Sequence, residues 1–139
     1  MMNMELKGSC LCGQVTWTVK GPFSGFHLCH CSRCRKDTGS AHASNLFALP
    51  GNIHWLSGQN QIKRFDLPEA KRFSTCFCIE CGSSVPYVSR NGQTLIIPAG
   101  GLDDDPGVVP EDNIFWEDRT DWYEQGLKSE KFESYPDKS

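Results

Sequence analysis

Residues 10–13 read CLCG, two cysteines and a glycine within four positions, and residues 78–82 repeat this arrangement as CIECG. A glycine directly after the second cysteine lets the backbone take a positive φ, so the turn closes tightly and its amides point at the sulfurs. Two such turns are typical of knuckles that pair to hold one Zn²⁺ with four thiolates. We therefore predict a structural zinc site, required by the fold, at Cys10, Cys12, Cys78 and Cys81.

A second group of cysteines lies in residues 29–39, CHCSRCRKDTG. If its start is extended, Cys29 and Cys31 point to one face and His30 to the other, so His30 is expected to pack or face solvent rather than bind metal. Cys34 follows in the first turn of a short helix, where backbone amides favour a thiolate. We predict a second, open zinc site with Cys29, Cys31 and Cys34 as ligands and water or a bound thiol in the fourth position.

Cys76 is the eighth cysteine and belongs to neither pattern. Disulfides are a competing explanation for the cysteines, but a reducing compartment removes them and bridges between cysteines two apart are strained. If residues 75–78 are extended, Cys76 shares a face with Cys78. It then either completes the second metal site or packs as a small buried hydrophobe, the commoner case.

Composition favours one zinc-binding domain over residues 1–139. Hydrophobic residues make up 38% of the 139 residues and charged residues 22%, with 13 Gly and 8 Pro, which indicates a turn-rich fold of short strands. A net charge of -3 argues against nucleic acid as a partner. We find no apolar run long enough to cross a membrane and no signal peptide at the start, and we expect a cytoplasmic protein.

Alternating hydrophobicity predicts a mainly β fold of short antiparallel strands. Val15, Trp17 and Val19 alternate with polar residues and should face inward. Similar patterns bounded by Gly, Pro or Asn predict further strands at residues 52–58, 61–67, 72–77, 84–89 and 94–100.

One short helix is predicted at residues 32–38, with Ser32 as its N-cap and Gly39 at its C-terminal end. The aromatic residues near the end of the chain should pack over the edge of the sheet rather than contact a ligand. They are Phe115, Trp116, Trp122 and Tyr123.

Five stretches in order, GSCLCGQVTWTV, CHCSRCRKDTGSA, FCIECGSSV, AGGLDDDP and IFWEDRTDWYEQGL, resemble the glutathione-dependent formaldehyde-activating enzyme (Gfa) family. The resemblance covers about residues 8–127. It implies an Mss4-like zinc-binding β fold with the two metal sites assigned above. It also implies a carbon–sulfur lyase that adds glutathione to formaldehyde to give S-(hydroxymethyl)glutathione.

The residues around the second site leave two functions open. Arg33, Arg35 and Lys36 either balance the charge of three thiolates or bind carboxylates of an anionic substrate. Addition of a thiol to an aldehyde also needs a proton donor or a cation near the new alkoxide, for which Lys36, Ser40 and His42 are candidates. The alternative function is a non-catalytic zinc module that carries a thiol ligand or binds a partner protein.

Overall fold

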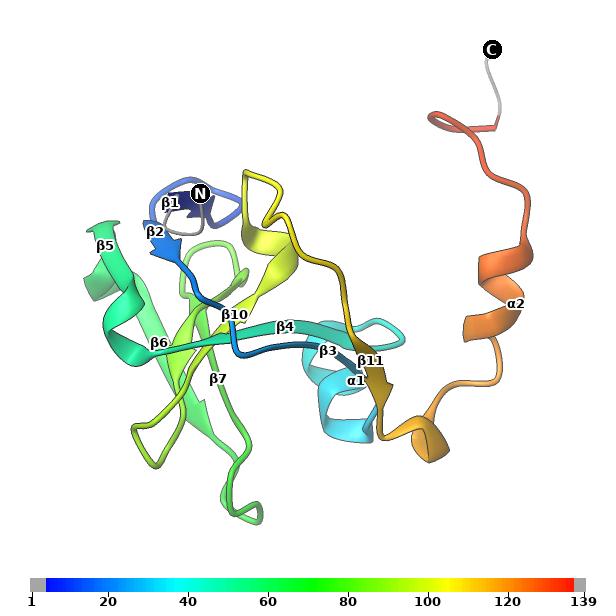
Figure 1. Cartoon of the computed structure of the whole chain (residues 1–139), viewed down its shortest axis with the longest axis horizontal. Helices are drawn as coiled ribbons and strands as arrows, with labels where there is room; N and C mark the ends of the chain where they lie inside the picture. Colours follow the sequence, from blue (N-terminus) through cyan, green and yellow to red (C-terminus); the bar gives the residue numbers. More distant parts are fainter. Residues whose placement is uncertain (1–4, 137–139) are drawn as a thin grey trace.

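The computed structural model describes residues 5–136, which fold mainly into short strands arranged in three sheets (Figure 1). The first sheet has the order β1 (Glu5–Ser9), β2 (Thr16–Lys20), β5 (Ile53–Ser57). The second has the order β11 (Asp112–Ile114), β3 (Gly25–Cys29), β4 (Ala43–Ala48), β10 (Leu95–Pro98), β9 (Tyr87–Val88). The third has the order β6 (Ile62–Asp66), β7 (Ser74–Cys78), β8 (Ser84–Val85). The predicted mainly antiparallel β fold is confirmed; β11 alone pairs in parallel, with β3.

Short helices connect these strands. Within the described residues, two are α-helices, α1 (Ser32–Thr38) and α2 (Tyr123–Lys128). The others are 3-10 turns: η1 (Pro50–Asn52), η2 (Gln59–Gln61), η3 (Ala99–Gly101) and η4 (Trp116–Asp118). The predicted helix at 32–38 is therefore confirmed, whereas α2 was not predicted. Its sequence gives no amphipathic signal, and none of its residues is buried.

The ends of α1 show why it forms where it does. Cys31, not the predicted Ser32, is the N-cap: its backbone is extended and its Sγ accepts a hydrogen bond from the Cys34 amide at 3.4 Å. Gly39 closes the helix in the left-handed conformation, with φ 65°, as predicted. A sulfur thus replaces the hydroxyl that usually caps a helix, because the same cysteine must turn toward its neighbouring thiols.

The main hydrophobic core contains side chains from strands of all three sheets. Val15 and Trp17 have no exposed surface and Val19 has 1%, which confirms the predicted inward face. The Trp17 ring meets Trp55 edge-on, with 5.9 Å between centroids. Gly8 lies opposite Trp17 in the register of β1 and β2, and a Cβ there would overlap the indole. A residue without a side chain therefore makes room for the largest buried ring.

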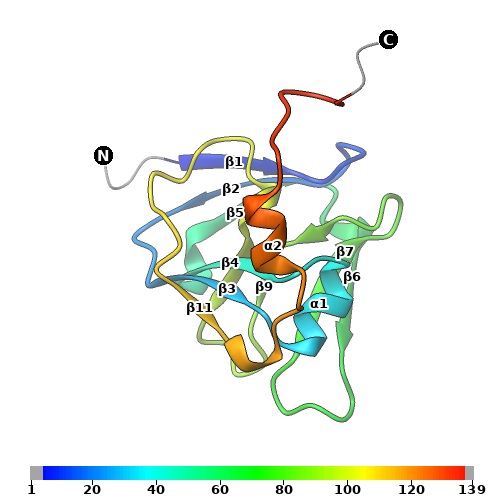
Figure 2. The same cartoon turned by 90° about the vertical axis from the view of Figure 1, so that its right-hand side faces the viewer.

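The segment after β11 carries the predicted tail aromatics. Figure 1 shows α2 set apart from the layers of strands, and Figure 2 looks onto the side of the molecule on which it lies. Phe115 is 56% exposed and Trp122 is 58% exposed, so the prediction that they pack over the sheet is wrong for these two residues. Trp116 and Tyr123 are half-buried. Among residues 5–136, none of the helices is both long and apolar enough to span a bilayer.

A glycine between β5 and η2 tests how closely this turn packs against the loop that precedes β2. Gly58 has φ 75°, and a Cβ there would overlap the backbone carbonyl of Gln14, in the loop that precedes β2. We expect Gly58→Ala to lower the free energy of unfolding by about 2 kcal/mol more than Gly92→Ala. Gly92 has a similar φ, 76°, but open space around it, so its substitution reports the backbone strain alone. Chemical denaturation measures both variants, and an equal loss of unfolding free energy in the two would contradict the prediction.

Candidate metal centres

The first cysteine cluster joins the β1–β2 turn to the β7–β8 turn. The four sulfurs of Cys10, Cys12, Cys78 and Cys81 all lie within 4.8 Å of one another. Cys12 Sγ is 3.6 Å from Cys10 Sγ and 3.8 Å from Cys78 Sγ. A tetrahedral zinc with Zn–S bonds of about 2.3 Å requires sulfurs about 3.8 Å apart. The donor set and its spacing therefore fit one Zn²⁺ held by four thiolates.

Each turn of this cluster has the conformation that its glycine predicted. Gly13 has φ 82° and Gly82 has φ 76°. The Gly13 amide donates to the Cys10 carbonyl at 3.0 Å, and the Gly82 amide donates to the Cys78 carbonyl at 2.7 Å. The Val15 amide also points at Cys10 Sγ, at 3.3 Å. The Val15 N–H thus stabilises negative charge on Cys10 Sγ, which favours metal binding, whereas the two glycine amides close their turns through carbonyl oxygens.

Ser83 connects the two turns. Its Oγ accepts a hydrogen bond from the Leu11 amide at 2.9 Å and lies 3.3 Å from Cys81 Sγ. Hydrogen bonding with the Ser83 side chain, and with the Ser83 and Cys12 amides, lowers the pKa of Cys81 to about 5. Cys81 is therefore in the thiolate form that a zinc ligand needs at neutral pH.

The second cluster contains three cysteines from two consecutive elements, β3 and α1. Cys29 ends β3, Cys31 caps α1 and Cys34 lies in its first turn, and their sulfurs lie within 4.8 Å of one another. Hydrogen bonding with Cys34 lowers the pKa of Cys29 to about 6, and the same interaction raises the pKa of Cys34. In the part of the chain that the structure describes, no other His, Cys, Asp or Glu joins this cluster. Its donors fit a metal that keeps one position for an outside ligand.

Cys76 lies apart from both clusters. It is 6% exposed in β7, where it pairs with Arg64 of β6 and Val85 of β8 and belongs to the main hydrophobic core. Burial raises the pKa of its thiol. Of the two predicted alternatives, the structure places Cys76 as a buried free thiol.

His30, between two cysteines of the second cluster, is completely buried. Its Nε2 is 2.9 Å from Asn113 Oδ1. Its ring centroid is 5.1 Å from His42, 5.0 Å from Trp116 and 4.9 Å from Tyr123. As expected, His30 packs and is not part of the sulfur cluster. The sequence did not reveal that Trp116 and Tyr123 enclose it, although both stood in the aromatic stretch at the end of the chain.

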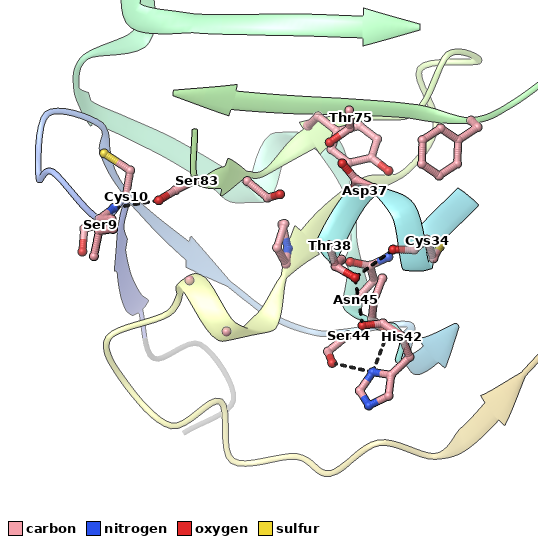
Figure 3. Close-up of a pocket in the computed structure, with 18 of the residues that line it drawn as sticks. Ser9, Cys10, Cys34, Asp37, Thr38, His42, Ser44, Asn45, Thr75 and Ser83 are labelled. Carbon is pink, nitrogen blue, oxygen red and sulfur yellow. Dashed lines mark hydrogen bonds between the residues drawn. The ribbon is translucent and has the colours of Figure 1, made fainter. Parts of the chain in front are cut away.

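A cavity of about 630 Å³ extends between the two clusters. Figure 3 shows Cys10 and Ser83 at one end of it, Cys34 and His42 at the other, and Asp37 beside Thr75. The remaining lining residues are Ser9, Leu11, Thr38, Ala43, Ser44, Asn45, Phe73, Ser84, Tyr87, Pro98, Gly100, Gly101 and Asp103. Cys34 therefore connects the three-cysteine cluster to a space that can admit a small molecule.

Of the three proton-donor candidates, only His42 lines the cavity; Lys36 and Ser40 do not. His42 Nδ1 is 3.3 Å from the Ala43 carbonyl and 3.2 Å from Ser44 Oγ. Burial lowers the pKa of His42, and nearby His30 lowers it further, so its imidazole is neutral at pH 7. The predicted substrate-binding residues Arg33, Arg35 and Lys36 also lie outside the cavity lining.

Comparison with known proteins agrees with this arrangement. The family described as glutathione-dependent formaldehyde-activating enzyme, Gfa, matches residues 5–118, which include all eight cysteines. The chain belongs to the Gfa family. A Halomonas elongata protein provisionally assigned to this activity is 31% identical to it over 98% of this chain and 92% of the relative. A crystal structure of a Rhodobacter sphaeroides protein shares the fold, with TM-score 0.60 and 23% identity over 76% of this chain and 98% of that protein.

The first cluster predicts a stability effect in this Gfa chain. We expect Cys12→Ser to lose one zinc and most of the folding free energy, because a structural zinc contributes on the order of 10 kcal/mol. Cys76→Ala is the matched control, since it removes a thiol outside both clusters and should keep the full metal content. Metal analysis and thermal unfolding check both variants. A Cys12→Ser protein that melts like the parent with all its metal would refute the assignment.

The enclosure of His30 predicts an effect on the second cluster. We expect Tyr123→Leu to weaken metal binding there by about 10–100-fold, the range for residues that support metal ligands. Trp122→Leu removes the adjacent, exposed aromatic and should leave affinity unchanged. Competition with a chelator, followed by metal analysis, measures both. Equal metal affinity in the two variants would show that the Tyr123 ring does not hold this Gfa site in place.

Proposed function

We propose that this chain adds a thiol, glutathione or a similar compound, to formaldehyde or another small aldehyde. The observation that carries the proposal is a cluster of three cysteines that has no fourth protein donor among the described residues. One of the three cysteines, Cys34, lines a cavity. Membership of the Gfa family supports the same reaction. A closed site of four cysteines would leave no place for a substrate sulfur.

Zn²⁺ held by Cys29, Cys31 and Cys34 would supply a Lewis acid that keeps an incoming thiol deprotonated near neutral pH. In the proposed reaction a sulfur–carbon bond forms, the carbonyl π bond breaks, and the thiol proton ends on the new hydroxyl oxygen. Cys34 and the cavity walls orient the thiol toward the aldehyde. A thiol and an aldehyde already combine readily in solution. The main contribution of these groups to the rate is therefore to hold the two reactants in the right orientation.

His42 is the residue best placed to move the proton. Its Nδ1 is held by Ser44 and the Ala43 carbonyl, and its Nε2 makes no hydrogen bond with the described residues. A neutral imidazole can accept the thiol proton at Nε2 and return it to the alkoxide oxygen. Arg33, Arg35 and Lys36 lie outside the cavity lining, where they offset the negative charge of three thiolates and remain available to carboxylates that extend beyond the cavity.

The alternative is a binding module without turnover. Exposed apolar side chains on the segment after β11, Phe115, Trp122 and Leu127, favour a partner protein as its ligand. In that case a thiol would bind at the second cluster, but added aldehyde would not be consumed faster than in the absence of protein. Rates with excess thiol and aldehyde therefore separate the two functions.

Cys31→Ser tests the proposed function with the fold preserved. Serine is a good N-cap, so it should keep the hydrogen bond from the Cys34 amide while it removes a metal ligand. We expect thiol-dependent turnover to fall about 100-fold or more and thermal stability to change little. Cys31→Ala, the matched control, loses the cap as well and should be less stable by about 1 kcal/mol. Full turnover in Cys31→Ser would overturn the proposal.

A further inference from the structure

The cavity beside the second cluster has an unbalanced charge. Its lining includes two carboxylates, Asp37 and Asp103, but no lysine or arginine. Within residues 5–136 neither carboxylate forms an ion pair. A ligand that enters this space therefore meets negative charge without a compensating cation from the protein.

The geometry of α1 explains this imbalance. Successive residues of a helix are about 100° apart, so Cys34, Asp37 and Thr38 share one face. All three line the cavity. Lys36 projects from the opposite side of the helix, whereas Arg33 precedes Asp37 by four residues and lies next to it on the helix surface; both are exposed and neither lines the cavity. The helix thus turns Lys36 away from the cavity, and Arg33 and Arg35 do not line it either.

Asp37 is the carboxylate closest to the cluster in the chain, one helical turn after Cys34. Asp37 is an exposed residue, but the protein atoms on one side of its carboxyl displace water and raise its pKa, and hydrogen bonding with Thr75 offsets part of that rise. A carboxylate in such a place gains from a cation in the cavity. Residues three apart on a helix have Cβ atoms about 5–6 Å apart, which corresponds to a cation two or three carbons from a sulfur held beside Cys34.

Asp103 lies on the opposite wall. Its two carboxylate oxygens accept hydrogen bonds from Ser9 Oγ at 3.0 and 2.9 Å, and its own amide donates to the Lys7 carbonyl. These bonds fix the carboxylate in position but leave its charge uncompensated. With Asp37 across the cavity, it disfavours a ligand that brings a carboxylate inside.

We propose that the thiol taken up by this site carries a primary ammonium group two or three carbons from its sulfur, and that Asp37 binds this ammonium. The inference rests on the proposed function, because it assumes that the thiol sulfur lies at the three-cysteine cluster. Asp37 is then a specificity-determining residue. Small aminothiols fit this description, whereas a thiol whose carboxylate lies equally near its sulfur does not.

The test compares three thiols of similar size that differ in charge: cysteamine, 2-mercaptoethanol and 3-mercaptopropionate. The protein is loaded with Co²⁺, and thiol binding is followed by sulfur-to-cobalt charge-transfer absorption without aldehyde. The comparison is between parent and Asp37→Asn for each thiol, so differences in thiol acidity cancel. Asp121→Asn is the matched control, since Asp121 is exposed and lies outside the cavity lining.

We expect Asp37→Asn to weaken cysteamine binding about tenfold, to leave 2-mercaptoethanol within about twofold, and to strengthen 3-mercaptopropionate binding. Asp121→Asn should change none of the three. Equal effects of Asp37→Asn on cysteamine and 2-mercaptoethanol would overturn this inference alone. A loss of 3-mercaptopropionate binding in Lys36→Gln would favour the basic residues instead and also overturn it. If no thiol changes the cobalt spectrum, the proposed function fails together with the inference.

Discussion

The pairing of the two glycine-ended knuckles is the constraint on which the other features depend. Cys12 and Cys78 lie 66 residues apart in the chain, yet their sulfurs are 3.8 Å apart. This contact fixes the first sheet against the third, and one wall of the cavity, including Cys10 and Ser83, belongs to the knuckles themselves. Loop closure over so long a segment costs only slightly more than over a short one, so the four metal–sulfur bonds of the predicted zinc site would outweigh it.

Short sequence patterns predicted the strands and turns whose formation depends mainly on residues close together in the chain. Val15, Trp17 and Val19 are all buried, as their alternation predicted, although Thr18 of β2 is buried as well, and Gly13, Gly39 and Gly82 stand where the backbone has positive φ. Strands β1, β3, β4 and β11 were missed. The burial of β3 and β4 does not alternate cleanly, β1 buries only Leu6 and Gly8, and β11 has no buried residue and forms only by pairing with β3. Such pairing depends on contacts distant in sequence, which no short pattern contains.

The candidate site also has a part that the sequence predicts and a part that it does not. Both clusters could be predicted from the cysteines, because few types of side chain bind zinc and zinc-binding cysteines occur at only a few spacings in turns. The cavity could not be predicted, since its walls come from β1, α1, β4, β7 and the turn after β10. Lys36 and Asp37 are neighbours in the sequence, and only the helix orientation decides which of them faces the ligand. The presence of charged residues next to the cysteines in the sequence therefore said less about the ligand than the face of α1 on which each charge lies.

The packing of Trp116 and Tyr123 against His30 has a consequence for how the protein matures. During synthesis the aromatic side chains that enclose the loop of the second cluster leave the ribosome only after all the cysteines of both clusters. The first cluster has all its ligands once Cys81 has emerged. We therefore expect the first cluster to be able to acquire its metal before the loop of the second cluster is enclosed. A nascent chain would thus present a stable scaffold with an exposed, exchangeable second site.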